Sequence, residues 1–138
     1  MKSLFLKIRG DKMENIKETI GLKIIGSFLL GVDDCTIQNI DIPNNVEYIA
    51  INAFDKCFNL TSLTIPNSVK YIAEYAFDAC NDLTDIAITN SIKVIEDRVF
   101  CCCFNLTNVF YYGTPDELKE INVSPDNDEL FEATVHCI

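Results

Sequence analysis

Residues 42–64 read IPNNVEYIAINAFDKCFNLTSLT, and two versions of the same stretch follow directly. Residues 65–87 read IPNSVKYIAEYAFDACNDLTDIA, and residues 88–110 read ITNSIKVIEDRVFCCCFNLTNVF. The blocks align without gaps at a spacing of 23 residues. A period of this length is typical of stacked repeats, because a single repeat cannot bury its apolar side alone. The chain is therefore predicted to form a solenoid.

Each repeat reads as a short strand, a turn and a return segment. In the second block, Leu63 and Ile65 are separated by one polar residue, so both face the same side of a strand. Pro66 lacks a backbone donor and begins a turn. Phe77 and Cys80 have the spacing of a short helical turn that points both side chains inward. Stacking of the corresponding residues predicts a continuous apolar core.

This repeat resembles the BspA-like leucine-rich repeat. The resemblance rests on Ile-Pro-Asn-Ser-Val from residue 65, on Ala76-Phe77, and on Cys80 and Leu83. It extends over about residues 24–138, where the closing segment also resembles that of the family. The resemblance implies an α/β repeat solenoid with parallel strands on the concave face. Short helical turns or strands are then expected on the convex side.

The ends of such a stack expose apolar edges and need caps. We expect three parts, namely a tail and capping helix at 1–23, repeats at 24–110 with a degenerate first copy, and a C-terminal cap at 111–138. Asp11 and Glu14 have the spacing of a capping box, and Gly21 can end a helix. Pro115 and Asp116 predict the start of another helix in the C-terminal cap.

The composition of the 138 residues indicates one folded domain. With 49% hydrophobic residues the chain is too apolar for a disordered protein, and a net charge of −10 argues against nucleic-acid binding.

Membrane insertion is not expected, because no apolar run is long enough to span a bilayer. Lys7 and Arg9 interrupt the apolar run near the start, so no secretory signal is recognised and a cytoplasmic location is favoured. Proteins of the resembled family, however, are often secreted or at the cell surface.

Seven cysteines are many for a chain of this length. Cys57, Cys80 and Cys103 share one repeat position, so we expect a buried column of reduced thiols. The run from Cys101 to Cys103 could indicate a metal or redox site. Neighbouring cysteines on a helical turn should point in different directions, and no second cysteine pair has zinc-site spacing. We therefore predict no metal site and no cofactor, and a thiol or metal sensor is kept as a third alternative.

No catalytic motif is present in the sequence. It contains no Gly-rich phosphate loop, no G-x-S-x-G and no H-E-x-x-H, so catalytic residues are not predicted. The favoured function is a non-catalytic protein-binding module, with adhesion or host contact implied by the resemblance. A structural role through self-association into a homo-oligomer or a larger array is the alternative.

The predicted binding face consists of the outward strand positions on the concave side. Alternation along the strands assigns to it Asn39, Asp41, Ser62, Thr64, Asp85, Ala87, Asn108, Phe110 and Tyr112. The two aromatic residues fit an interaction hot spot, unless the C-terminal cap covers them.

Overall fold

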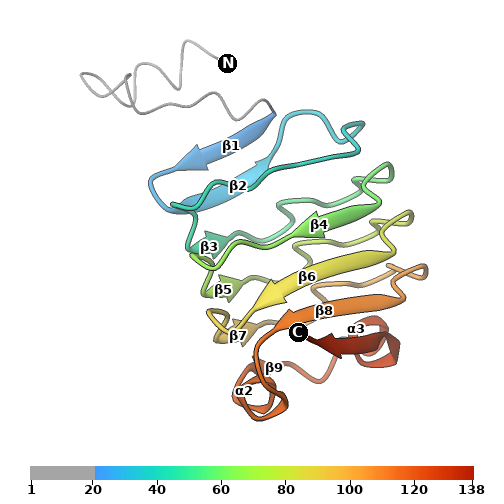
Figure 1. Cartoon of the computed structure of the whole chain (residues 1–138). Coiled ribbons are helices and arrows are strands. Elements are labelled where there is room, and N and C mark those ends of the chain that lie inside the picture. Colours follow the sequence, from blue (N-terminus) through green and yellow to red (C-terminus); the bar gives the residue numbers. More distant parts are fainter. Residues whose placement is uncertain (1–20) are drawn as a thin grey trace.

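The computed structural model describes residues 21–138, and the capping helix expected around Asp11 and Glu14 lies outside this range. The chain forms stacked rungs, each being one copy of the repeat (Figure 1). The elements in chain order are β1 (Leu22–Ile25), β2 (Phe28–Val32), β3 (Tyr48–Ile49), β4 (Ser62–Thr64), β5 (Tyr71–Ile72), β6 (Asp85–Thr89), β7 (Val94–Ile95), β8 (Asn108–Tyr112), α2 (Pro115–Lys119), β9 (Asn122–Val123), α3 (Asp128–Glu132) and β10 (Thr134–Cys137).

Two sheets form the sides of the stack. The long-strand sheet has the order β10-β8-β6-β4, and the short-strand sheet has the order β1-β2-β3-β5-β7-β9. Equivalent residues pair in parallel from rung to rung, as Ser62 does with Asp85 and Tyr71 does with Val94. Only the β1–β2 hairpin is antiparallel within the described range. The predicted solenoid with parallel strands and a repeat of 23 residues is thus confirmed.

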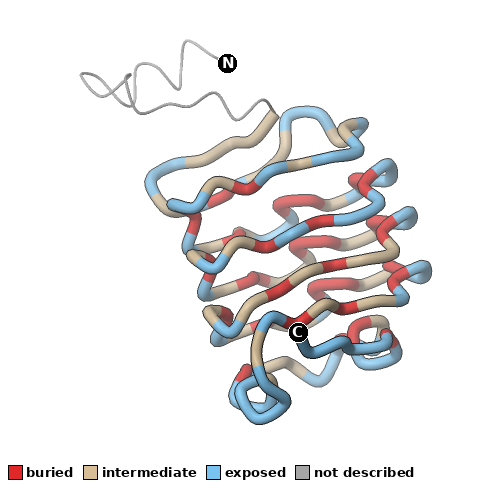
Figure 2. The backbone as a smooth tube through the Cα atoms, viewed as in Figure 1, coloured by how far each residue is buried: buried red, intermediate tan, exposed pale blue. Residues whose placement is uncertain are grey.

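The core lies between the two sheets, where the buried residues of successive rungs lie above one another (Figure 2). Leu63 and Ile65 are buried as the strand pattern predicts. The turn predicted at Pro66 is closed by a hydrogen bond from the Val69 N–H to the Pro66 carbonyl, at 3.1 Å. Phe54, Phe77 and Phe100 form a stack of nearly parallel rings with centroids 4.9 and 5.3 Å apart. Since each ring packs on its neighbour, burial couples the rungs to one another.

A third side of the stack is formed by arcs, the segments 50–57, 73–80 and 96–103 that follow the short strands. Here the structure corrects the sequence prediction, because Phe77 and Cys80 lie in successive tight turns and not in a helical turn. Two positions of each arc have left-handed backbone with φ between 54° and 62°, namely Asn52 and Lys56, Tyr75 and Ala79, and Arg98 and Cys102. These turns aim backbone N–H groups at the next rung. The N–H of Phe54, for example, donates to the carbonyl of Ala76 at 2.7 Å.

The C-terminal segment continues both sheets. Strand β9 pairs with β7, and β10 pairs with β8. The helix start predicted at Pro115 is present as α2, where Thr114 and Glu117 form a capping box. The buried side chain of Asn127 accepts a hydrogen bond from the Val99 N–H at 3.0 Å, and thereby ties this segment to the last arc.

Candidate ligand-binding face

The long-strand sheet brings most of the predicted face residues together. Residues that face the core on this sheet, such as Leu63 and Ile86, are buried, so the alternate positions point outward. The register places the outward positions in two rows across the strands. One row contains Ser62, Asp85 and Asn108, and the other contains Thr64, Ala87 and Phe110.

Asn39 and Asp41 do not belong to these rows, contrary to the prediction that both are outward strand positions of the face. Both side chains are exposed, but the structure has no strand there. Within the described chain, residues 38–42 donate and accept no backbone hydrogen bond. The rung before them is the β1–β2 hairpin, and β4 is the edge of the long-strand sheet, paired with β6 and not with this segment. The face therefore begins at β4.

Strand β10 extends the face with two residues that the sequence did not indicate. Thr134 lies beside Asn108, and His136 lies beside Phe110. The segment carries no copy of the repeat pattern, so periodicity could not place it. Its only signal was the presence of alternating residues after α3, and that signal is weak in a strand of four residues.

A line of hydrogen-bonded side chains crosses the face from β6 to β10. The Asn108 side chain donates from Nδ2 to Oδ1 of Asp85 at 2.8 Å. Oδ1 of Asn108 lies 2.9 Å from Nε2 of His136. The other carboxylate oxygen of Asp85 accepts a hydrogen bond from Thr84 Oγ1 at 3.0 Å. These bonds fix the orientation of polar groups that would otherwise rotate freely, which lowers the entropy cost of binding a partner.

The two aromatic residues of the face differ in exposure. The rings of Phe110 and His136 stack with centroids 5.0 Å apart, so the C-terminal segment partly covers Phe110. Tyr112, at the end of β8, is 50% exposed. The sequence left open whether the C-terminal cap hides both rings. In the structure it shields one and leaves the other accessible.

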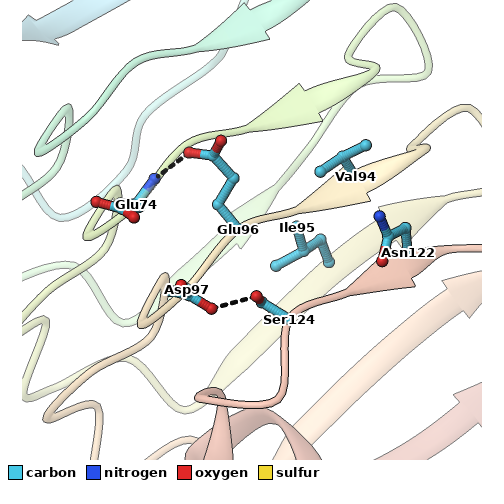
Figure 3. A pocket seen from close by; sticks show the side chains of 7 residues that line it. All are labelled: Glu74, Val94, Ile95, Glu96, Asp97, Asn122 and Ser124. Atoms are coloured by element: carbon cyan, nitrogen blue, oxygen red, sulfur yellow. Dashed lines mark hydrogen bonds between the residues drawn. The ribbon is translucent and has the colours of Figure 1, made fainter.

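A second concave region lies on the short-strand side and encloses about 260 Å³ (Figure 3). Two of its three carboxylates, those of Glu96 and Asp97, have hydrogen-bond partners. The Tyr71 hydroxyl and the Glu74 N–H both donate to the carboxylate of Glu96, and the Ser124 hydroxyl donates to Asp97. Burial is the larger cause that raises the pKa of Tyr48 above its usual value, and the negative charge of Glu96 is the smaller one. These bonds join neighbouring rungs and thus contribute to the cohesion of the stack.

The cysteines of the repeat column, Cys57, Cys80 and Cys103, are buried free thiols as expected. Cys101 and Cys102 differ from the prediction, because their Sγ atoms do not point apart but lie 3.6 Å from each other. The left-handed backbone of Cys102 explains the difference, since the prediction assumed a helical turn.

A search of the described residues for membrane-spanning helices finds none with the required length and hydrophobicity.

Comparison with known proteins identifies the repeat. The family described as BspA type Leucine rich repeat region matches residues 9–125 in six copies. A leucine rich cell surface protein from Faecalibacterium prausnitzii A2-165 is similar in structure, with a TM-score of 0.60 and 29% identity over 62% of this chain. A T. pallidum Leucine Rich Repeat protein gives a TM-score of 0.53 with 28% identity over 56% of this chain. The alignments cover 23% and 36% of those two proteins, and no curated protein matches the sequence.

Proposed function

The chain belongs to the BspA-type leucine-rich repeat family, and on this premise we propose that it is a non-catalytic protein-binding module. The proposed binding surface is the outward face of the long-strand sheet. The observation that carries the proposal is the hydrogen-bonded line of Asp85, Asn108 and His136, together with the exposed ring of Tyr112 at the end of β8. Oriented polar groups next to an accessible aromatic ring are typical of protein interaction sites.

The residues proposed to contact a partner lie on β4, β6, β8 and β10. They are Ser62, Thr64, Asp85, Ala87, Asn108, Phe110, Tyr112, Thr134 and His136. Asp85 supplies negative charge, and the chain as a whole has a net charge of −10. A partner with basic side chains around an apolar contact therefore fits this face best.

The test compares the chain with two double variants in affinity capture followed by quantitative mass spectrometry. In Asp85→Lys with Phe110→Ala, the charge and the ring of the face are both changed. The control is Asp82→Lys with Phe104→Ala, which makes the same chemical changes at two exposed positions outside the face. We expect specific partners to be lost from the face variant and retained by the control. Partners that bind both variants equally would refute this surface.

The location of the protein determines which partners are available. The similar F. prausnitzii protein is described as a cell surface protein. The capture experiment is therefore performed with native lysate and with host extracellular matrix in parallel. Protease treatment of intact cells distinguishes the two locations, because only a surface protein is cleaved before lysis. An adhesion role predicts cleavage and capture from the matrix.

Assembly through self-association is the second candidate function, and the open end of the stack supports it. Strand β10 is an edge strand whose four residues are all exposed. Nearby apolar groups are also exposed, with Phe131 at 58%, Val135 at 43% and Ile138 at 64%. Edge strands with apolar neighbours tend to pair with another chain. Sedimentation velocity tests this function, since assembly predicts a dimer that Val135→Lys converts to a monomer, and a monomeric wild-type chain contradicts it.

A further inference from the structure

The repeat geometry brings two adjacent cysteines next to a carboxylate from the preceding rung. Asp78 and Cys101 occupy the same position in successive arcs, 23 residues apart. The backbone joins these arcs directly, because the Ala79 N–H donates to the Cys101 carbonyl at 2.8 Å. Cys102 follows with left-handed backbone, and its side chain turns toward that of Cys101. In residues 21–138 this is the one group of three metal-binding side chains whose ligand atoms lie within 4.8 Å of one another.

The separation of the two sulfur atoms agrees with that of a tetrahedral metal centre, and an Asp78 oxygen lies within 4.8 Å of both. Two thiolates bound to zinc at about 2.3 Å lie about 3.8 Å apart, and a thiolate and a carboxylate oxygen lie about 3.6 Å apart. The observed separation of the Cys101 and Cys102 Sγ atoms is 3.6 Å. The pair can thus bind a single ion with only small movements. Asp78, Cys101 and Cys102 are all partly exposed, so an ion can reach them from solvent.

The surroundings of the pair are negatively charged. Glu129 on α3 lies beside it, where its carboxylate accepts a hydrogen bond from the Cys102 N–H at 2.9 Å. Burial, the neighbouring Cys102 thiol, and the carboxylates of Asp78 and Glu129 together raise the pKa of Cys101 to about 12. The same carboxylates would favour a cation at this position. A divalent ion that displaces the two thiol protons would neutralise the local negative charge.

We propose that Asp78, Cys101 and Cys102 bind one thiophilic divalent cation of the Zn²⁺ type. The two thiolates and one Asp78 oxygen supply three ligands, and a water molecule or Glu129 takes the fourth position. Each ion bound releases two thiol protons to the solvent. The sequence predicted no metal site because it contains no second cysteine pair with zinc-site spacing. A solenoid can instead provide the missing ligand from the neighbouring rung.

The test uses the full chain, reduced and freed of metal, titrated with Co²⁺ as a spectroscopic probe and then with Zn²⁺ in competition. We expect one Co²⁺ per chain, with the near-ultraviolet thiolate-to-cobalt charge-transfer band and the intense visible bands of tetrahedral cobalt. Cys101→Ser and Cys102→Ser should each abolish the charge-transfer spectrum of the bound pair. Asp78→Asn should keep both thiols and weaken binding by about tenfold or more. Cys137→Ser, at an exposed cysteine outside the group, is the matched control and should bind normally.

Three results would overturn the proposal. They are the absence of a charge-transfer band at saturating Co²⁺, equal binding by Asp78→Asn and the wild type, and loss of binding in Cys137→Ser. Thermal unfolding provides a second readout, since Zn²⁺ should raise the melting temperature of the wild type and of Cys137→Ser. Asp78→Asn leaves the arc cysteines in place, so it decides the question even where a serine variant does not fold.

Discussion

The thiol of Cys80 donates a hydrogen bond to the backbone carbonyl of Phe54 in the preceding rung, with Sγ and O 3.1 Å apart. Cys103 repeats the contact with Phe77 at 3.0 Å. The repeat cysteine is thus a small apolar side chain and also the partner of a buried carbonyl. The neighbouring Cys103 thiol and burial raise the pKa of Cys80, and burial raises that of Cys57. The thiols of Cys57 and Cys80 are thereby held in the protonated form.

The cysteines should consequently separate into reactive and unreactive groups. In the native protein we expect Cys57, Cys80 and Cys103 to resist alkylation by N-ethylmaleimide, while the exposed Cys137 reacts quickly. Peptide mapping by mass spectrometry measures the rate at each site. After unfolding without a reductant, all 7 cysteines should react. Labelling of Cys80 as fast as Cys137, or fewer reactive thiols in the unfolded chain, would contradict a reduced column.

Replacement of Asn127 by Ala should destabilise the protein by about 2–4 kcal/mol, because it leaves one buried and two partly buried backbone groups without their partner. The Asn127 side chain is fully buried. It accepts from the Val99 N–H and donates to the carbonyls of Glu96 and Ser124, at 2.8 and 3.0 Å. Urea unfolding followed by circular dichroism measures the loss. The control Asn105→Ala removes one exposed hydrogen bond and should cost less than about 1 kcal/mol. Equal losses of unfolding free energy in the two variants would contradict this prediction.

Glycine should be favoured at the left-handed positions of the arcs. Ala79 has φ of 55°, a conformation that costs a side-chain-bearing residue energy and costs glycine little. After the greater freedom of glycine in the unfolded state is subtracted, Ala79→Gly should stabilise by about 0.5–1 kcal/mol. Ala76→Gly is the matched control, because Ala76 is fully buried and is not left-handed. It should destabilise by about 1–2 kcal/mol. The measurement is the urea midpoint of each variant, which should be higher for Ala79→Gly than for Ala76→Gly. A higher midpoint for Ala76→Gly would contradict the prediction.

Glu117 should make part of the stability depend on pH. The Thr114 N–H and then the Asn90 side chain lower the pKa of its carboxyl below the ordinary 4.5. A lowered folded-state pKa gives stability that is complete above pH 4.5 and is lost as the pH falls through the folded-state value. We expect wild type and Glu117→Gln to differ most in urea midpoint at neutral pH and to converge below pH 4.5. The control is Glu120→Gln, at a neighbouring carboxylate with no side-chain hydrogen bond in the described structure, and it should retain the pH dependence that Glu117 gives the wild type.

Most of the fold could be predicted from the sequence, because its period is expressed in many columns at once. Leu63, Ile65 and Phe77 have counterparts in the neighbouring blocks, and each column gave the same inward direction. The left-handed positions gave no such signal. Tyr75 and Ala79 adopt a conformation for which glycine would be the usual indicator, and the rung-to-rung hydrogen bonds of the arcs compensate for it.

The candidate face was predictable only where strands repeat. Asp85, Asn108 and Phe110 followed from alternation, because each lies in a strand whose register the repeat sets. His136 could not be found, since β10 joins the sheet without a repeat of its own. Asn39 was assigned to a strand on pattern alone, while pairing depends on the rung before it. Contacts between Asp78 and the cysteines likewise depend on stacking and not on proximity in the sequence.

The aligned peptide groups of the arcs give the stack a dipole along its axis. Beyond the first residue of each arc, the N–H groups that bond between rungs donate toward the C-terminal end, as from Phe54 to Ala76 and from Phe77 to Val99. Peptide dipoles aligned in this way leave partial positive charge at the last arc, as at the beginning of an α-helix. Acceptors from the acidic C-terminal segment meet this pole, where Asn127 and Glu129 bind N–H groups of the last arc. Any rung or partner added there must present oxygen atoms to the arc, and one added at the opposite end must present N–H groups.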